Sequence, residues 1–317
     1  MPVPLIIDSD ISPDSWAAIL FAALNPNTDL LAVTASGTGE AHGPRGARNA
    51  QRLLHLAGRS DIPVGFGPAR PLSGDKHFPR LMRFVIDRLM FQKVPAPPQF
   101  QPARDAITLI ADTLRQSSQP VTIAAVGPQT NMATVLMREP ALIDKIKSIY
   151  IMGGALDVPG NIQGLDRRSD NTTAEWNFYC DPLAAQMVFE SGVPVYLVPL
   201  DATNRAPVSE KFKRELAAID NPPAQFYSRV LNLLTGALGQ RDTFYLWDPI
   251  TTACAVNPSL AVFTKRRVAM VTQPEHAWGC VSETPDGVEI NVAQQVNANK
   301  FENAFLDAFA SFSTKDK

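Results

Sequence analysis

The sequence has few cysteines and histidines and no surplus of positive charge. Its three cysteines, Cys180, Cys254 and Cys280, are far apart and odd in number, which argues against a disulfide framework and against a CxxC metal site. The net charge of −2 provides no basic field for nucleic acid or for an anionic membrane. The N-terminus has no charged leader before an apolar core, and no apolar run approaches the roughly 18 residues of a membrane span. We therefore expect a soluble, cytoplasmic protein with a small-molecule substrate and no nucleic-acid or membrane partner.

Apolar strand-like runs alternate with helix-like stretches over most of the 317 residues. The predicted strands cover residues 5–7, 30–35, 121–126, 149–151 and 195–198. The predicted helices cover residues 13–24, 45–57, 106–116, 129–137 and 181–190. This rhythm is typical of an α/β fold in which a mostly parallel central sheet carries helices on both faces.

The remaining segments complete this picture. Beyond Arg267 the runs "VAMVTQ" and "DGVEINVAQQV" predict a late β-ribbon, closed by a terminal helix over residues 298–312. Residues 78–102 end in the proline-rich "KVPAPPQFQP", which favours an ordered surface loop after a short helix over a domain linker. Because we see no internal repeat and no low-complexity tract, we expect residues 1–317 to form a single domain.

The stretch "LIIDSDISPDSWAAIL", residues 5–20, gathers three carboxylates, Asp8, Asp10 and Asp14, at the end of an apolar run. The run suits a strand buried on both faces, and Pro13 suits the first turn of a helix. The acids therefore lie at the carboxyl end of a strand, the edge where open parallel sheets bind ligands. Neighbouring carboxylates repel one another unless a cation, a donor-rich ligand or a shared proton offsets the repulsion.

Other predicted strands are followed by similar polar loops, in "VGPQTN", "IMGGAL", "AEWNFYCDP" and "YLWDP". If these loops share one sheet edge, they bring Glu175, Asn177 and Asp248 to Asp10 and Asp14. Taken singly, each such Asp is more often a helix cap. Together the set is rich in oxygen acceptors and poor in cations, which suits a hard metal ion and a substrate with several hydroxyls, a sugar.

Taken together, these segments resemble the nucleoside hydrolase family of the inosine-uridine preferring type, nearly end to end. The family opens with D-x-D-x-G-x-D-D, which Asp8, Asp10 and Asp14 match and from which Ser12 and Ser15 depart. The other matching segments are "RNAQRLLHLAG", "VGPQTNMA", "IMGG", the "GN" at 160–161, "AEWNFYCDPLAA" and "VNANKFENAFLDAF". The resemblance implies hydrolysis of the N-glycosidic bond of ribonucleosides by a metal-activated water, and assembly into homodimers or homotetramers.

The resemblance also implies roles for individual residues. A calcium ion would be held by Asp10, the main-chain carbonyl of Val126 and Asp248, with Asp10 also taking a proton from the attacking water. The implied substrate-binding residues are Asp14, Glu40, Met152, Asn161, Glu175, Asn177, Trp247 and Asp248. Carboxylates around the sugar suit this chemistry because the transition state resembles an oxocarbenium ion.

Three departures from the family pattern change the expectation. Ser15 stands where the family has a calcium-binding Asp, so two carboxylate ligands remain and we expect weaker calcium binding. Trp247 stands where the uridine-accepting subgroup has a histidine. A tryptophan there is typical of the purine-preferring subgroup, where it stacks on the base and favours its protonated form by cation–π attraction. We therefore predict a purine preference, with Trp247 taking part in catalysis.

The third departure is the lack of the family's H-G-x-x-G run in residues 67–91. Phe78, Phe84 and Met90 are candidates for the wall of the base pocket in its place.

Two other interpretations stay open at this point. The motif "IIDSDIS" also fits a haloacid dehalogenase-type phosphatase, with Asp8 as nucleophile and Asp10 as acid/base, although the later Lys and Gly-Asp acidic pair of that class are missing from the sequence. The second interpretation is a non-catalytic family member that binds a nucleoside or a sugar. It stays open because Ser15 replaces a metal ligand, and a fold can persist when its function changes.

Overall fold

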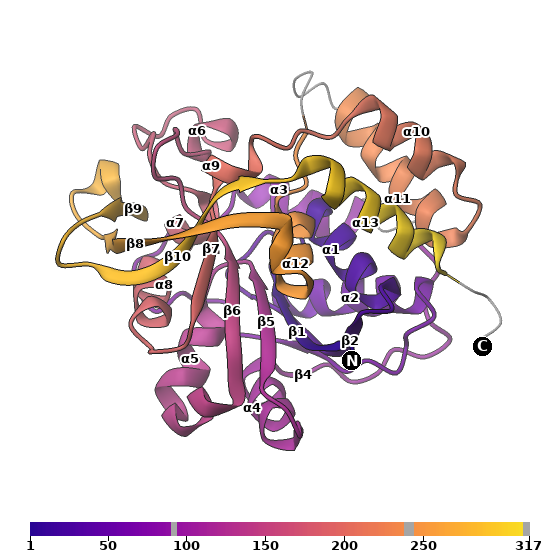
Figure 1. Ribbon diagram of the computed structural model, residues 1–317, viewed down its shortest axis with the longest axis horizontal. Helices are drawn as coiled ribbons and strands as arrows, with labels where there is room; N and C mark the ends of the chain where they lie inside the picture. The colour runs from indigo at the N-terminus through magenta and orange to yellow at the C-terminus, as the bar shows by residue number, and fades with distance from the viewer. Residues whose placement is uncertain (90–93, 238–243, 313–317) are drawn as a thin grey trace.

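Ten strands form one sheet in the computed structural model, which describes residues 1–89, 94–237 and 244–312 (Figure 1). The strand order is β4-β3-β2-β1-β5-β6-β7-β10-β8-β9. The strands are β1 (Val3–Ser9), β2 (Thr28–Ala35), β3 (Val64–Phe66), β4 (Arg104–Asp105), β5 (Val121–Val126), β6 (Ile146–Met152), β7 (Val195–Val198), β8 (Ala261–Val271), β9 (Cys280–Glu283) and β10 (Val288–Val296). From β4 to β10 the neighbours are parallel, while β8 runs antiparallel to β10 and to β9.

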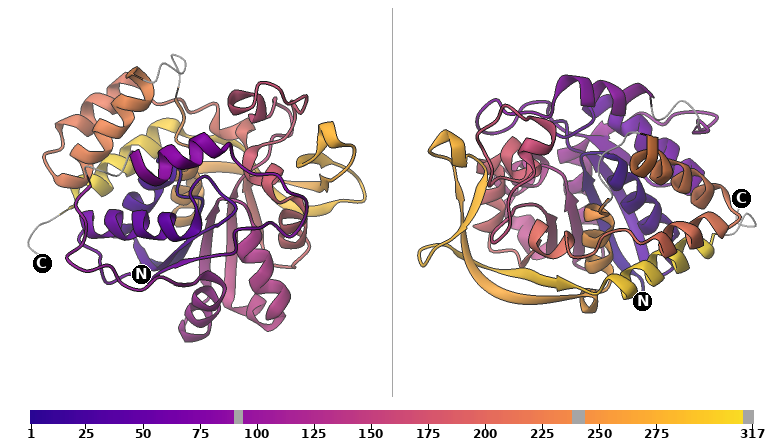
Figure 2. Two further views of the ribbon diagram at one scale, coloured as in Figure 1. Left: turned by 180° about the vertical axis from the view of Figure 1, so that it is seen from behind. Right: turned by 90° about the horizontal axis from the view of Figure 1, so that it is seen from above.

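Helices cover both faces of the sheet (Figures 1 and 2). Their bounds are α1 (Pro13–Leu24), α2 (Gly43–Leu56), α3 (Arg80–Phe84), the π-helix η1 (Val85–Leu89), α4 (Ala106–Gln116), α5 (Thr130–Arg138), α6 (Ile162–Leu165), α7 (Trp176–Cys180), α8 (Pro182–Phe189), α9 (Leu200–Thr203), α10 (Glu210–Ala218), α11 (Pro222–Asn232), the π-helix η3 (Leu233–Ala237), α12 (Trp247–Val256) and α13 (Ala298–Ala310). Short 3₁₀ turns η2 (Pro140–Lys145), η4 (Pro258–Leu260) and η5 (Glu275–Ala277) complete the chain.

The alternation of side chains along β1 divides the core into two layers. Leu5 and Ile7 pack with α1, α2, α12 and α13, whereas Ile6 packs with α4, α5 and α8 on the other face. All three side chains are fully buried, because a parallel strand covered on both faces has no solvent side. This confirms the predicted α/β fold with a mostly parallel sheet.

The predicted elements are found to within a few residues, apart from the start of the late ribbon, while several observed elements, among them β3, β4, α6 and α9, were not predicted. The late ribbon is confirmed, but β8 begins at Ala261, before the predicted start. The pair α10 and α11 was not predicted; it packs beside α13 at one end of the molecule (Figures 1 and 2). Helix α10 buries only Phe212 and Leu216 of its nine residues, so few apolar positions mark it in the sequence. In the part of the chain that the structure describes, no helix has the length and apolarity of a membrane span.

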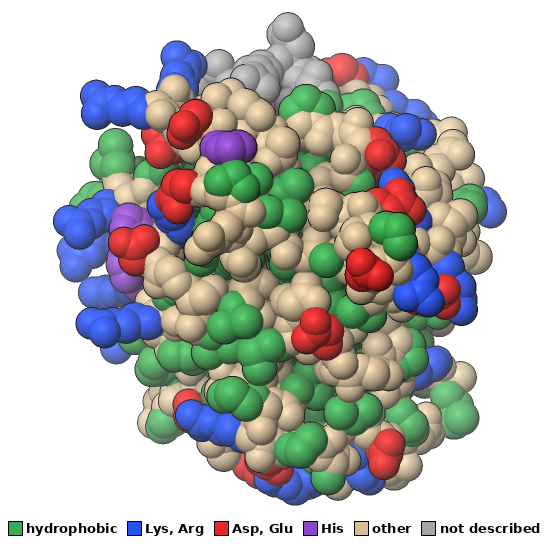
Figure 3. All heavy atoms as spheres, turned by 90° about the vertical axis from the view of Figure 1, so that its left-hand side faces the viewer, with side chains coloured by type: hydrophobic (Ala, Val, Ile, Leu, Met, Phe, Trp, Pro, Cys, Tyr) green, Lys and Arg blue, Asp and Glu red, His purple; other side chains and the backbone are tan. Residues whose placement is uncertain are grey.

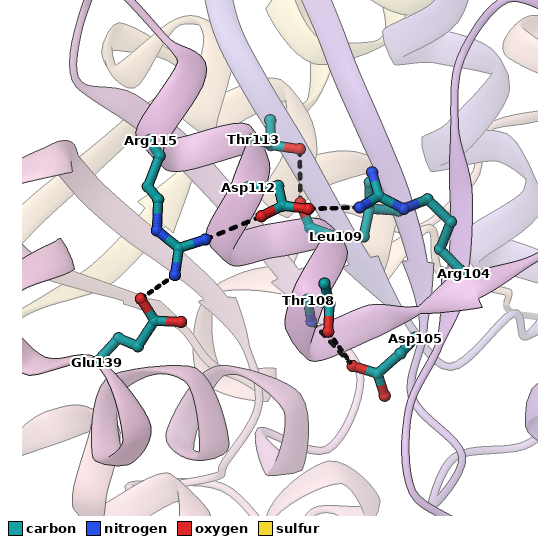
Figure 4. A network of polar contacts seen from close by, with 8 residues as sticks. All are labelled: Arg104, Asp105, Thr108, Leu109, Asp112, Thr113, Arg115 and Glu139. Atoms are coloured by element: carbon teal, nitrogen blue, oxygen red, sulfur yellow. Dashed lines mark hydrogen bonds and ion pairs between the residues drawn. The ribbon is translucent and has the colours of Figure 1, made fainter.

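The surface carries charges of both signs. On the face drawn in Figure 3, acidic and basic side chains are interspersed with hydrophobic ones over the described atoms. At the β4 edge of the sheet, Asp112 accepts hydrogen bonds from Arg104 and Arg115, and Arg115 also pairs with Glu139 (Figure 4). This network ties β4, α4 and the end of α5 together at an exposed site, where ion pairs stabilise a fold only slightly.

The core and this surface network predict very different costs of substitution. Phe305 of α13 is fully buried and stacks on Phe21 of α1 and on Phe309, so Phe305→Ala is expected to lower the free energy of unfolding by about 3–5 kcal/mol. Asp112→Asn is expected to lower it by less than about 1 kcal/mol, because both arginines stay solvated. Urea denaturation of both variants measures this, and equal losses would contradict the packing described here.

Candidate active site

The topology of the sheet gathers the loops that carry the acids. The chain passes from β1 outward through β2, β3 and β4 on one side, and then through β5, β6 and β7 on the other. Open parallel sheets bind ligands at such a switch point. Ser9 at the end of β1 pairs with Val126 at the end of β5. A Cβ on Gly127 would lie 2.7 Å from the Asp10 amide nitrogen, so only glycine lets the two loops approach this closely and brings Val126 beside Asp10.

Two serine hydroxyls join three buried carboxylates, those of Asp10, Asp14 and Asp248. The Ser15 hydroxyl lies 3.0 Å from Asp10 Oδ1 and also contacts Asp248 Oδ2. The Ser12 hydroxyl lies 2.7 Å from Asp14 Oδ1 and 3.3 Å from Asp248 Oδ2. The main-chain N–H of Asp248 donates to Asp14 Oδ2 at 3.2 Å. We call these five residues the acid cluster; it unites three predicted site residues with the two serines that depart from the family pattern.

Two helix ends stabilise negative charge in the acid cluster. Asp14 lies in the first turn of α1 and Asp248 in the first turn of α12. The unpaired N–H groups and the positive end of the dipole favour anions there. Ser12 also caps α1, since its hydroxyl accepts the N–H of Ser15 at 3.3 Å.

The turn between β1 and α1 has a strained backbone at Ile11, the residue that follows Asp10. Ile11 has a φ of 61°, a conformation that a β-branched residue rarely adopts. Its N–H donates to Ser9 Oγ at 2.9 Å, and its carbonyl accepts the indole N–H of Trp16 at 2.8 Å. Strain of this kind, on the order of 1–3 kcal/mol, persists where the surroundings impose it and is common at functional sites. Here it directs Asp10 Oδ1 to the N–H of Ser12, at 2.9 Å.

The carboxyls of the site have pKa values above the usual range of carboxylic acids. Burial raises the pKa of Asp10 to about 6, and the nearby Asp14 raises it further. Burial, followed by the charges of Asp14 and Asp10, raises the pKa of Asp248 well above its usual range. The pKa of Glu40 is also raised well above its usual range, first by burial and then by Asp10 and Asp14, and Glu40 Oε2 has no hydrogen-bond partner among the described residues. These acids therefore need protons or a cation.

A second group of predicted residues lies after β6. The Glu175 carboxylate caps α7 and accepts the N–H of Asn177 at 2.9 Å and that of Gly154 at 3.1 Å. Asn177 Nδ2 donates to the main-chain carbonyl of Met152 at 3.1 Å. Burial raises the pKa of Glu175 to about 7, with a smaller contribution from the charge of Asp10. Glu175 therefore lies within electrostatic range of the acid cluster.

The segment around α7 also contains the last predicted ribose residue and part of the proposed base wall. Asn161 Oδ1 accepts the N–H of Trp176 at 3.0 Å, which ties Asn161 to the helix that carries Asn177. Phe78 is buried and stacks on Trp176, with ring centroids 4.9 Å apart. Phe84 is half exposed, and Met90 lies outside the described residues.

Trp247 immediately precedes Asp248 and is held on two sides. Its indole N–H donates to Asn204 Oδ1 at 2.9 Å. Its ring stacks on Tyr245, with centroids 5.9 Å apart and planes inclined by 14°. The orientation of this half-buried ring is therefore fixed beside the acid cluster.

Asp8 is not part of the cluster. It is buried, and its Oδ1 accepts hydrogen bonds from the Thr34 hydroxyl at 2.6 Å and from Asn131 Nδ2 at 2.7 Å. These bonds join β1, β2 and α5 behind the Asp10 turn. A buried carboxylate so engaged is a poor phosphatase nucleophile, which removes the geometric basis of the dehalogenase-type interpretation.

Sequence reasoning missed three side chains that border the site. Tyr227 of α11 is fully buried, and its hydroxyl has no partner among the described residues. Burial raises the pKa of Tyr227, and the charges of Asp14 and Asp248 raise it further. Arg83 and Asn204 contact loops of the site from α3 and from the end of α9. Each lies far in sequence from the acids, so no local motif marks it.

The donors at the switch point are all hard oxygens. Asp10 and Asp248 supply carboxylates, Ser15 a hydroxyl and Val126 a main-chain carbonyl, the ligand types that calcium prefers. The described residues include no set of three or more His, Cys, Asp or Glu side chains arranged to hold a metal. The residues present therefore fit a calcium ion with fewer charged ligands.

Comparison with known proteins identifies the family. The family profile described as inosine-uridine preferring nucleoside hydrolase matches residues 5–303. The chain belongs to this family. It is 34% identical over 293 residues to the pyrimidine-specific ribonucleoside hydrolase RihA of Escherichia fergusonii, which covers 88% of each chain.

Solved structures of nucleoside hydrolases share the fold. A plant nucleoside hydrolase, PpNRh1, superposes with a TM-score of 0.85 at 25% identity, over 98% of this chain and 99% of that one. A purine-preferring ribonucleoside hydrolase from Gardnerella vaginalis gives 0.81 at 24% identity, over 97% and 98%. As a nucleoside hydrolase, the protein cleaves the N-glycosidic bond of ribonucleosides.

The raised pKa values predict how stability depends on pH when metal is removed. Asp8 and Asp10, with pKa values of about 6, and Glu175, at about 7, hold protons in the folded state that the unfolded chain has lost above its pKa of roughly 4. Their stabilising contribution is full below pH 4 and is lost as the pH rises through 6 to 7. In a chelator, the melting temperature is therefore expected to fall between pH 5 and pH 8.

Asp8→Asn provides the control for this prediction, because it keeps the acceptor for Thr34 and Asn131 but cannot ionise. Between pH 5 and pH 8 the fall is expected to be smaller in this variant by about 1–1.5 kcal/mol in unfolding free energy, because only about one unit of the rise in the pKa of Asp8 lies above pH 5. A melting temperature that stays level or rises from pH 5 to pH 8 in the native protein would contradict the assignment.

Proposed function

We propose that this nucleoside hydrolase prefers purine ribonucleosides and releases free base and ribose. The observation that carries the proposal is Trp247, fixed by Asn204 and Tyr245 next to Asp248. An indole face attracts a cationic ring, so it favours the protonated purine that leaves most readily. Relatives include a pyrimidine-specific and a purine-preferring enzyme, so membership of the family does not by itself set the base preference.

In this proposal Asp10 is the general base. A carboxylate with a pKa of about 6 is ionised at neutral pH yet basic enough to accept a proton from water. Asp14 would bind the 2′-hydroxyl of the ribose, Asn177 the 3′-hydroxyl, and Asn161 with Glu175 the 5′-hydroxyl, with Met152 beside them. The carboxylates also stabilise the positive charge that develops on the ribose as the bond to the base breaks.

Glu40 is proposed to contact the leaving base. Its carboxyl is buried among Asp10 and Asp14, which holds its pKa well above the usual range. As an acid it can contact the protonated purine that Trp247 favours.

A calcium ion is proposed at Asp10, Asp248 and the Val126 carbonyl. Such an ion supplies Lewis acidity, which lowers the pKa of a water molecule toward neutrality. The Ser15 hydroxyl would contribute a neutral oxygen in place of the family's carboxylate. We also propose that residues 1–317 form a single domain and assemble as a homodimer or homotetramer, as the family resemblance implies.

The replacement at Ser15 predicts weak calcium binding that one substitution strengthens. Ser15→Asp adds a third carboxylate to the donor set, and ligand charge raises calcium affinity, so the dissociation constant is expected to fall by an order of magnitude or more. Calorimetric titration of the metal-free protein measures it. Ser118→Asp adds the same charge at an exposed position and is expected to leave affinity unchanged. Tight binding in the native protein that Ser15→Asp does not alter would disprove the reasoning.

The base preference is tested by comparing inosine with uridine. The native protein is expected to have the higher kcat/KM for inosine. Trp247→Ala removes the cation–π contribution, about 0.5–2 kcal/mol, and should lower kcat/KM for inosine roughly 2- to 30-fold relative to uridine. Trp247→Phe keeps an aromatic face and should lose less. Faster hydrolysis of uridine by the native protein would remove the purine proposal.

A further inference from the structure

The loop between β2 and α2, residues 36–42, closes directly on Asp10; we call it the Glu40 loop. The main-chain N–H of Ala41 donates to the carbonyl of Asp10 at 3.0 Å. A Cβ on Gly39 would lie only 2.2 Å from the Asp10 Cβ, so the backbone at Gly39 rests against the Asp10 side chain. A shift of the Glu40 loop would therefore displace Asp10, the proposed general base.

The position of Glu40 depends on the backbone of its loop. Its Oε2 is buried and has no hydrogen-bond partner among the described residues. Side-chain contacts of Ser36, Thr38 and Thr130 hold the first part of the loop, through hydroxyl pairs of 2.8 Å and 3.0 Å. The part that carries Glu40 needs another support.

Arg83 of α3 supplies that support. Its side chain is buried, with 8% of the residue exposed. Nη2 donates to the carbonyl of Gly37 at 2.9 Å and to the carbonyl of Ala41 at 3.1 Å. One guanidinium nitrogen thus bridges the two sides of the Glu40 loop. Ala41 therefore connects Arg83 to Asp10. Its carbonyl accepts the hydrogen bond from Arg83, and its N–H donates to the carbonyl of Asp10.

A second contact, one turn along, fixes the same segment to the loop. Asp87 of η1 accepts the main-chain N–H of His42 at 3.0 Å and lies 2.6 Å from His42 Nδ1. Helix η1, which continues α3, packs against α2. Arg83 and Asp87 are four residues apart on one helical segment. Arg83 therefore bridges the two sides of the Glu40 loop, and Asp87 holds its end at His42.

We propose that Arg83 is a positioning residue for nucleoside hydrolysis, which acts through the Glu40 loop on Asp10 and Glu40. This proposal rests on the hydrolytic activity of the family and on the roles proposed above for Asp10 and Glu40. The planar guanidinium suits the task because it presents N–H donors in a fixed geometry, whereas an ammonium is a point charge on a flexible stem. Burying the guanidinium is costly unless it is hydrogen-bonded; the two loop carbonyls accept from Nη2, whereas Nε has no partner among the described residues.

The test compares Arg83→Met, Arg83→Lys and the native protein with inosine and with uridine. Misplacing a reacting group by about 1 Å can cost 10²-fold, so Arg83→Met is expected to lower kcat about 10- to 100-fold on whichever nucleoside the native protein hydrolyses. Arg83→Lys should recover part of the loss. Arg48→Met is the matched control, because Arg48 is exposed on α2 and lies over Phe100; it should keep native kcat.

Rescue with free guanidinium separates positioning from general stability. In Arg83→Ala, millimolar guanidinium chloride is expected to restore part of kcat without raising the melting temperature. A native kcat in Arg83→Met would overturn the proposal. The proposal would also be overturned if kcat fell in proportion to the melting temperature and neither Arg83→Lys nor free guanidinium restored it.

Amide hydrogen exchange gives a readout independent of catalysis. In Arg83→Met the amides of residues 37–42 are expected to exchange at least tenfold faster, with β2 unchanged, and guanidinium should slow them in Arg83→Ala. Retained protection would overturn the proposal even if no nucleoside tested were hydrolysed. The inosine-to-uridine ratio of the native protein, in contrast, reports only on the base preference assigned to Trp247.

Discussion

The structure depends on one electrostatic constraint: three carboxylates are buried together with little positive charge to offset them. Asp10, Asp14 and Asp248 repel one another and lose solvation, and each nearby feature lowers that cost. The Ser12 and Ser15 hydroxyls lie between the acids, and two helix N-termini direct their N–H groups at them. The strained turn at Ile11 is the conformational cost of holding Asp10 in place. The negative charge that the surroundings do not offset can be neutralised by protons, by a cation or by a positively charged transition state. Cleavage of a glycosidic bond passes through such a transition state, which this remaining charge stabilises.

The sheet topology explains why this constraint arises at one place. Because the chain leaves β1 in one direction and β5 in the other, the loops at their carboxyl ends diverge and expose a common edge. Glycine at 127 lets the β5 loop reach Asp10, and glycine at 39 lets the Glu40 loop do the same from the other side. The late segment that carries Asp248 returns to this edge through α12, which packs on α1.

Much of this arrangement was predictable because its signals are local. Apolar runs ending in polar turns predicted the parallel sheet. The acids that follow predicted strands, together with the family resemblance, led us to expect Asp10, Asp14 and Asp248 at one edge of it. Arg83, Asn204 and Tyr227 could not be found in the same way. Their contacts span long sequence separations, and an arginine or tyrosine on a helix has no periodic signature of its partner. Helix α10 was missed because only two of its nine residues are buried, so few apolar positions mark it in the sequence. Helix α11 was missed although seven of its eleven residues are buried. The roles of Ser12 and Ser15 also needed the structure, since the sequence shows two lost family residues but not the hydroxyl network that replaces them.

The central claim is that protons and a cation compete to neutralise the same buried acids. Metal ligands must lose their protons to bind, so calorimetric titration of calcium at pH 6, repeated in two buffers of different ionisation enthalpy, tests the claim directly. We predict a difference in heat between the two buffers that corresponds to a net release of protons when calcium binds. Binding with the same heat in both buffers, and therefore without proton release, would contradict it.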